Sequence, residues 1–170
     1  MDAKKVFTGN HVILYDRDDW EFVERKRGIE AVAVAALTPE GKMLLTEQFR
    51  RPVNAPVIDV AAGLIGDEGN DDADATARQE LEEETGYRCG RLERVAGGPT
   101  SPGITNEIIL FYVARDLERV GAGGGVGNEK ITVHEIAMDG VVEWLQARER
   151  EGKLIDLKVW SALYFLSKST

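Results

Sequence analysis

The chain has 170 residues, of which 43% are hydrophobic and 30% charged, and this composition fits one globular domain, alone or with a small appendage. Its net charge of −9 argues against a nucleic-acid-binding protein, although a small phosphorylated substrate is compatible if metal ions and local arginines reverse the sign in the pocket. The single cysteine, Cys89, excludes an intramolecular disulfide, and the longest apolar run, Ala31 to Leu37, is too short to span a membrane, so we expect a cytoplasmic protein.

The first part of the chain is predicted to form strands. Residues 4–27 read as two or three short strands joined by polar turns. The run from Glu30 to Leu37 is apolar on both faces, which is typical of a fully buried strand. A turn at residues 39–41 leads into an alternating strand from Met43 to Phe49. We expect these two strands to form a hairpin.

A strand over Pro56 to Ala62 ends at Gly63, and an acidic, glycine-containing loop follows at residues 66–70. Either Asp71 or Asp72 can cap a helix that runs to Thr85. The helix is expected to stop at Gly86, because glycine adopts the left-handed conformation of a helix C-terminus without strain.

The second half of the chain is predicted to mix strands and helices. Strands are expected around 91–96, 105–114 and 130–137, and helices over roughly 139–151 and 156–168. Residues 121–127 are rich in glycine and form either a flexible linker or a mobile functional loop. This order of elements favours an α/β sandwich over a regular βαβ alternation.

The helix ending at Thr85 carries an acidic cluster. At about 100° per residue, Glu80, Glu83 and Glu84 share one sector beside the face that packs on the sheet, whereas Glu82 points away. Charge runs are usually solvated faces, but like charges at this spacing repel, and negative charge is disfavoured late in a helix. A lysine, an arginine or Mg²⁺ would compensate this charge, and Mg²⁺ prefers such oxygen ligands.

The segment from Gly63 to Tyr87 resembles the Nudix box, and residues 80–87 match the second half of the box throughout. The resemblance implies a Nudix α/β/α sandwich with a mixed β-sheet, and a divalent cofactor, Mg²⁺ or alternatively Mn²⁺. The implied metal ligands are Glu80, Glu83, Glu84 and the backbone carbonyl of Ala62.

Two departures from the box are visible. Gln79 stands where the family has an arginine that orients the carboxylates, with Arg78 displaced by one position. Either Gln79 performs this task through neutral hydrogen bonds, or Arg78 reaches around the helix. The stretch before the helix is also longer than the pattern, and Asn70 or Asp71 replaces the glutamate in the middle of the box.

Similarity outside the box points to the ADP-ribose and nucleoside diphosphate sugar pyrophosphatase branch. Residues 47–52 resemble a strand end where an arginine contacts substrate phosphate, with Arg50 as the positional match and Arg51 as the reserve. Residues 101–107 resemble a Ser-Pro-Gly signature, in which Ser101 and Gly103 would shape the pocket wall. Glu107 would bind substrate hydroxyls or a metal water.

A glutamate after the glycine-rich segment is the candidate catalytic base. By resemblance to the same branch, we expect Glu129 to approach the attacking water from a mobile arm, with Glu83 and Glu84 as the other catalytic residues. The alternative is an exposed loop carboxylate. His134 is expected to belong to strand structure, and His11 to be structural or exposed.

The N-terminal strands are expected to form a small antiparallel sheet over residues 1–28 that builds a homodimer beside a catalytic domain over 29–170. Trp20 lies in this sheet. It either packs in the dimer core or stacks on a nucleobase across the interface.

The resemblance implies a hydrolase that splits the pyrophosphate bond of ADP-ribose or another nucleoside diphosphate sugar into a nucleoside monophosphate and a sugar phosphate. The expected partner is therefore a small nucleotide sugar, with no nucleic acid and no membrane. Two alternatives are a Nudix sensor that binds a nucleotide sugar without hydrolysis and a house-cleaning pyrophosphatase for nucleoside triphosphates.

Overall fold

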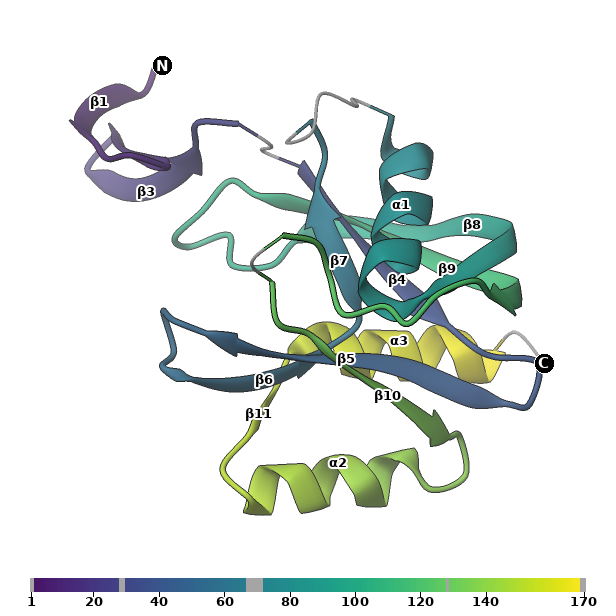
Figure 1. The fold of residues 1–170 in the computed structure, drawn as a ribbon. Coiled ribbons are helices and arrows are strands. Elements are labelled where there is room, and N and C mark those ends of the chain that lie inside the picture. The colour runs from purple at the N-terminus through teal and green to yellow at the C-terminus, as the bar shows by residue number, and fades with distance from the viewer. Residues whose placement is uncertain (1, 28–29, 67–71, 128, 169–170) are drawn as a thin grey trace.

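The computed structural model describes residues 2–27, 30–66, 72–127 and 129–168. The N-terminal strands form one antiparallel sheet in the order β1-β2-β3, as predicted, and this sheet projects from the rest of the molecule (Figure 1). Its strands are β1 (Lys4–Thr8), β2 (Val12–Arg17) and β3 (Trp20–Arg25). The predicted domain boundary between residues 28 and 29 lies outside the described residues.

Two mixed four-stranded sheets form the body of the protein. The first has the order β7-β4-β9-β8, with β4 and β9 parallel, and consists of β4 (Glu30–Ala36), β7 (Ala61–Leu64), β8 (Tyr87–Pro99) and β9 (Ile108–Arg119). The second has the order β10-β5-β6-β11, with β6 and β11 parallel, and consists of β5 (Lys42–Arg50), β6 (Ala55–Asp59), β10 (Thr132–Ala137) and β11 (Leu154–Ile155).

The predicted hairpin between the strands over Glu30 to Leu37 and Met43 to Phe49 is wrong. Strands β4 and β5 lie in different sheets, and they meet at the turn, where Leu37 and Met43 form an isolated bridge. Strand β4 is apolar on both faces because it is a central strand that pairs with β7 on one side and β9 on the other. Both of its edges are therefore occupied by partners that come later in the chain.

The predicted strand over Pro56 to Ala62 is divided in two. Strand β6 ends at Asp59 in the second sheet, and β7 begins at Ala61 in the first. Val60 alone joins them, and it is 1% exposed. The chain thus changes sheets over one buried residue, immediately before the segment that resembles the Nudix box.

Helices pack against both faces of strand β4, which explains why all of its residues after Glu30 are apolar. Val32 and Val34 belong to the core cluster that contains Leu81 of α1 (Ala73–Thr85). The alternate residues, Ala33 and Ala35, belong to a second cluster together with α2 (Val141–Arg150) and α3 (Leu157–Lys168). Figure 1 shows α1 on one side of the first sheet, with α3 and the second sheet on the other. The α/β/α sandwich with mixed sheets is confirmed.

Helix α1 begins and ends where the sequence predicts. Asp72 caps it, because its side chain accepts hydrogen bonds from the N–H groups of Asp74 and Ala75. Gly86 ends it in the left-handed conformation, with φ of 78°. Among the helices in the described residues, none is long and apolar enough to cross a membrane.

Candidate active site

The three glutamates predicted as metal ligands lie on α1, which packs beside strand β7, and the fourth predicted ligand, Ala62, belongs to that strand. Glu84 is buried, at 7% exposure, whereas Glu80 and Glu83 are half-buried. A Cβ atom at Gly63 would overlap the Glu80 carboxylate, so glycine at this position leaves room for that side chain against the strand. Glu82 lies elsewhere on the helix and forms a surface ion pair with Arg88 at 2.9 Å, as expected for a side chain that points away.

Glu84 occupies an electrostatically strained position. Its Oε2 accepts a hydrogen bond from the Ala62 N–H at 3.2 Å. Burial, followed by the charge of Glu80, raises the pKa of Glu84 to about 8; the charges of Asp59 and Glu129 act in the same direction, and the hydrogen bond from Ala62 acts against them. The charges of three other carboxylates therefore act on the one buried carboxylate.

This donor set fits a divalent cation. Carboxylate oxygens are the ligands that Mg²⁺ takes, and a cation would relieve the repulsion that Glu84 experiences. Within the described ranges, no three His, Cys, Asp or Glu side chains are already arranged as a metal-holding group. The carboxylates therefore provide the chemistry for a metal site, with adjustment of side chains on binding.

Gln79, which stands at the position of the family arginine, contacts the acidic cluster through a neutral hydrogen bond. Its Nε2 donates to Oε1 of Glu83 at 3.0 Å, which fixes that carboxylate without adding positive charge. Arg78 does not reach around the helix. It donates instead to the backbone oxygen of Cys89 at 2.8 Å and contacts the Cys89 Sγ. Of the two alternatives for orienting the carboxylates, the structure therefore shows the neutral hydrogen bond from Gln79 and not a contact from Arg78. Asn70 and Asp71, the positions of the missing glutamate, lie outside the described residues.

The glycine-rich segment is docked on the end of helix α1. The N–H of Gly124 donates to the carbonyl of Glu84 at 2.8 Å, and the N–H of Gly125 donates to the carbonyl of Glu83 at 3.0 Å. These bonds satisfy carbonyls that a helix end leaves without partners. Gly123 has φ of +68°, and a Cβ there would lie 2.5 Å from the carbonyl carbon of Thr85. In the described part of this segment, glycine permits close backbone contact as well as turning.

Glu129 follows this segment and is exposed. Its Oε2 accepts a hydrogen bond from the Val126 N–H at 3.1 Å. Glu129 is nevertheless near enough for its charge to raise the pKa of Glu84, so the predicted base and the acidic cluster are neighbours. His134 belongs to β10 and contacts Glu47 at 2.9 Å, which agrees with a structural role, and His11 is exposed.

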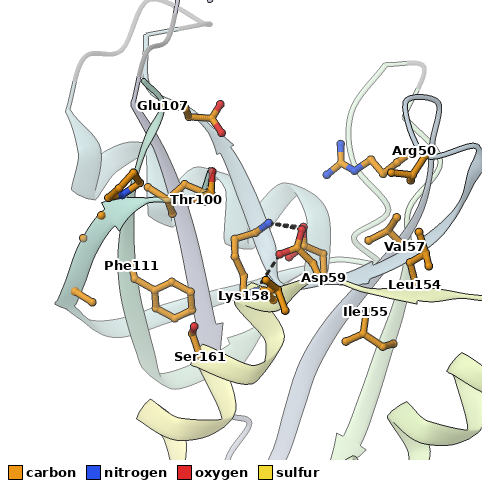
Figure 2. A pocket seen from close by; sticks show the side chains of 18 of the residues that line it. Arg50, Val57, Asp59, Thr100, Glu107, Phe111, Leu154, Ile155, Lys158 and Ser161 are labelled. Carbon is orange, nitrogen blue, oxygen red and sulfur yellow. Dashed lines mark hydrogen bonds and ion pairs between the residues drawn. The ribbon is translucent and has the colours of Figure 1, made fainter. Parts of the chain in front are cut away.

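A cavity of about 920 Å³ adjoins the acidic cluster, and both Arg50 and Glu107 line it from opposite sides (Figure 2). Asp59 connects the two regions, because it lines the cavity and its charge acts on Glu84. The volume suits a nucleotide-sized ligand. Arg51 is exposed and does not line this cavity.

The Ser-Pro-Gly segment contacts the N-terminal sheet. The Trp20 Nε1 donates to the carbonyl of Gly103 at 3.1 Å, while the Trp20 side chain remains 62% exposed. Trp20 lines a second, smaller hollow of about 470 Å³. Ser101 is exposed, and neither Ser101 nor Gly103 lines either of these two cavities. Residues 101–103 thus lie beside the N-terminal sheet and not in the wall of the larger cavity.

Four charged residues of the cavity wall were missed by the sequence reasoning: Arg25, Asp59, Asp156 and Lys158. Arg25 forms an ion pair with Glu107 at 2.6 Å, so Glu107 is partly neutralised. Asp59 and Lys158 form a buried ion pair at 3.1 Å. A signal for Asp59 was present, since it is the one charge within an apolar run over 57–62.

Comparison with protein families matches residues 27–154 to the NUDIX domain. A methanol dehydrogenase activator of Bacillus methanolicus is 34% identical over 98% of this chain and 90% of its own length. An ADP-ribose pyrophosphatase of Bacillus subtilis strain 168 is 29% identical over 96% of this chain and 89% of its own length. A GDP-mannose pyrophosphatase of Escherichia coli O9:H4 strain HS is 33% identical over 85% of this chain and 83% of its own length.

Among solved structures, an ADP compounds hydrolase matches the fold with a TM-score of 0.73. The match covers 99% of this chain and 91% of that chain, at 16% sequence identity. At this identity the likeness bears on the fold.

Proposed function

Because the chain belongs to the NUDIX domain family, we propose that it is a metal-dependent hydrolase that splits the pyrophosphate bond of a nucleoside diphosphate sugar. Two of the relatives, an ADP-ribose pyrophosphatase and a GDP-mannose pyrophosphatase, are named for activity on such compounds. The observation that carries the proposal is the buried Glu84 carboxylate, which experiences the charges of other carboxylates, among them Asp59 in the wall of a nucleotide-sized cavity.

The metal ligands in this proposal are Glu80, Glu83, Glu84 and the backbone carbonyl of Ala62. Mg²⁺, or alternatively Mn²⁺, would supply positive charge for the diphosphate and would lower the pKa of the attacking water. Glu84 is already desolvated, so its interaction with a cation is stronger than that of an exposed carboxylate.

The remaining residues act on the substrate and the water. The guanidinium of Arg50 faces the cavity and donates hydrogen bonds to a phosphate there (Figure 2). Glu129 accepts a proton from the water whose oxygen attacks one phosphorus in line. The bridging P–O bond breaks, and the two products are a nucleoside monophosphate and a sugar phosphate.

A panel of nucleotide sugars tests this activity. ADP-ribose, ADP-glucose, GDP-mannose and UDP-glucose are incubated with the protein and Mg²⁺ or Mn²⁺, and products are measured as phosphate released by added phosphatase. Glu84→Gln should lower kcat at least about 100-fold, as expected for loss of a charged group at the reacting centre. Glu82→Gln, on the same helix but paired with Arg88, should retain wild-type turnover.

The same panel separates the alternatives. Tight binding of a nucleotide sugar without turnover would support the non-hydrolytic sensor, and turnover confined to nucleoside triphosphates would support the house-cleaning enzyme. Either result would contradict the proposed activity.

We further propose that residues 1–28 form the contact between the two copies of a homodimer. Large apolar side chains are exposed on this sheet, including Phe7 at 64% and Trp20 at 62%, and exposed apolar groups of this size often mark an interface. Light scattering on the purified protein should give twice the mass of one chain, and Phe7→Ser should shift the protein toward the monomer. We place the protein in the cytoplasm, since its single thiol needs no oxidising compartment.

A second candidate function follows from the relative named a methanol dehydrogenase activator. Its similarity covers 98% of this chain, including segments outside the matched NUDIX domain. The test is the rate of methanol oxidation by the dehydrogenase of Bacillus methanolicus with and without this protein. An increase that Glu84→Gln abolishes would tie activation to hydrolysis, and an unchanged rate would contradict this second function.

A further inference from the structure

A buried lysine on the C-terminal helix is paired with an aspartate at the end of strand β6. The Nζ of Lys158 lies 3.1 Å from Oδ2 of Asp59 and 2.8 Å from Oδ2 of Asp156. The Lys158 and Asp59 side chains retain only 16% and 8% of their exposure. Burial lowers the pKa of Lys158, but the two carboxylates outweigh burial and raise it, so the lysine is charged.

Asp59 stands at the point where the chain crosses between sheets. Its Oδ1 accepts a hydrogen bond from the N–H of Val60 at 2.8 Å, and Val60 alone separates β6 from β7. Three residues after Asp59, the N–H of Ala62 donates to the Glu84 carboxylate on α1. A continuous path therefore runs from α3 through Asp59 and the crossover to Glu84.

The ammonium group of Lys158 can donate three hydrogen bonds, and it has two carboxylate partners, Asp59 and Asp156. Figure 2 shows the Lys158 Nζ pointing to Asp59. The lysine therefore acts on its partner, and through that partner on the crossover.

We propose that Lys158 and Asp59 are positioning residues for the metal site: their buried ion pair fixes the crossover over residues 59–62, and with it the Ala62 backbone and the Glu84 carboxylate. This inference rests on the proposed function, because it concerns the carboxylates assigned there to the metal. Groups that orient metal ligands without contacting the ion commonly alter metal affinity 10–100-fold when they are replaced.

The test is the dissociation constant of Mn²⁺ for the full-length protein, measured by titration calorimetry without substrate. Lys158→Met should weaken Mn²⁺ binding by about 10–100-fold. It should also lower kcat while leaving KM for the nucleotide sugar within about twofold, because Lys158 acts through Asp59. Lys158→Arg, which keeps the charge, should restore part of the affinity.

A matched control is available in Lys153, whose Nζ pairs with Glu47 at 2.7 Å and whose side chain is similarly buried, at 21% exposure. Lys153→Met removes a comparable ion pair whose acidic partner, Glu47, lies on β5 and not in the crossover itself, so it should leave Mn²⁺ affinity unchanged. If both lysine variants weakened Mn²⁺ binding equally, the loss would reflect general destabilisation of the protein, and the inference would be overturned.

Folding of each variant is checked by circular dichroism. Should Lys158→Met fail to fold, the double variant Lys158→Met with Asp59→Asn carries the same test, since it leaves no unpaired buried charge. Wild-type Mn²⁺ affinity in a folded variant, or a raised KM at unchanged kcat, would overturn the positioning role. Absence of both Mn²⁺ binding and turnover in the wild-type protein would instead contradict the proposed function.

Discussion

Replacement of Glu84 by glutamine should stabilise the metal-free protein increasingly as the pH rises. Burial, followed by the charge of Glu80, raises the pKa of Glu84 from 4.5 to about 8 in the folded state. Between these two pH values the folded chain binds the proton more tightly than the unfolded chain does, so stability falls as pH rises through this window. Glutamine keeps the size of the side chain and its acceptor for the Ala62 N–H, but it never ionises.

The size of the effect follows from the same values. At about 1.4 kcal/mol per pH unit, full ionisation of Glu84 costs a ceiling of about 5 kcal/mol, and relaxation of the site would reduce this to about 2–4 kcal/mol. The variant should match the wild-type protein at pH 4 and exceed its unfolding free energy by about 2–4 kcal/mol at pH 8.5.

Urea unfolding in buffer with a chelator, at several pH values between 4 and 8.5, measures this difference. Glu82→Gln is the control, because its partly exposed ion pair with Arg88 should contribute less than about 1 kcal/mol with no rise across the window. Saturating Mg²⁺ should stabilise the wild-type protein and have less effect on Glu84→Gln. A difference between wild type and Glu84→Gln that stays flat with pH would refute the description of Glu84 as a carboxylate buried among like charges.

Three further predictions concern residues around this helix. Gln79→Arg should raise the unfolding free energy of the metal-free protein by up to about 1 kcal/mol, since a guanidinium beside Glu83 offsets like charges, and urea unfolding would detect it. Leu81→Ala should cost about 2–5 kcal/mol in the same assay, because Leu81 is 0% exposed in the core; a smaller loss would indicate that the cavity collapses. Gly123→Ala should lower the melting temperature more than Gly127→Ala, because both have positive φ but only a Cβ at Gly123 meets backbone; equal losses would contradict docking of the loop on α1.

The parts of the structure that could be predicted are those specified by local chemistry. Helix α1 was bounded correctly because a capping aspartate and a terminating glycine act within a few residues of the helix they delimit. The placement of Glu80, Glu83 and Glu84 in one sector of α1 follows from helical spacing alone. The pairing of β4 could not be predicted in this way, since its parallel partner β9 begins at Ile108, far along the chain.

The parts of the site that were missed depend on contacts between distant segments. Lys158 lies on the last helix, and its meeting with Asp59 arises because β11 pairs with β6 just before that helix begins. The direction taken by Arg78 depended on the position of Cys89 in the following strand. Ser101 and Gly103 were expected at the cavity wall, but their neighbour in the structure is a sheet that the sequence placed in a separate appendage.

The attachment of Gly124 and Gly125 to the end of α1 fixes how far Glu129 can travel. The first part is anchored on the helix, and the Glu129 N–H donates to the Val126 carbonyl at 3.1 Å, so little free chain remains before Glu129. One added residue extends a chain by up to about 3.5 Å. Adding or deleting one residue there would displace the carboxylate by more than a hydrogen-bond length. Variation in length should therefore be tolerated poorly at this point, even though a glycine-rich stretch looks permissive on paper.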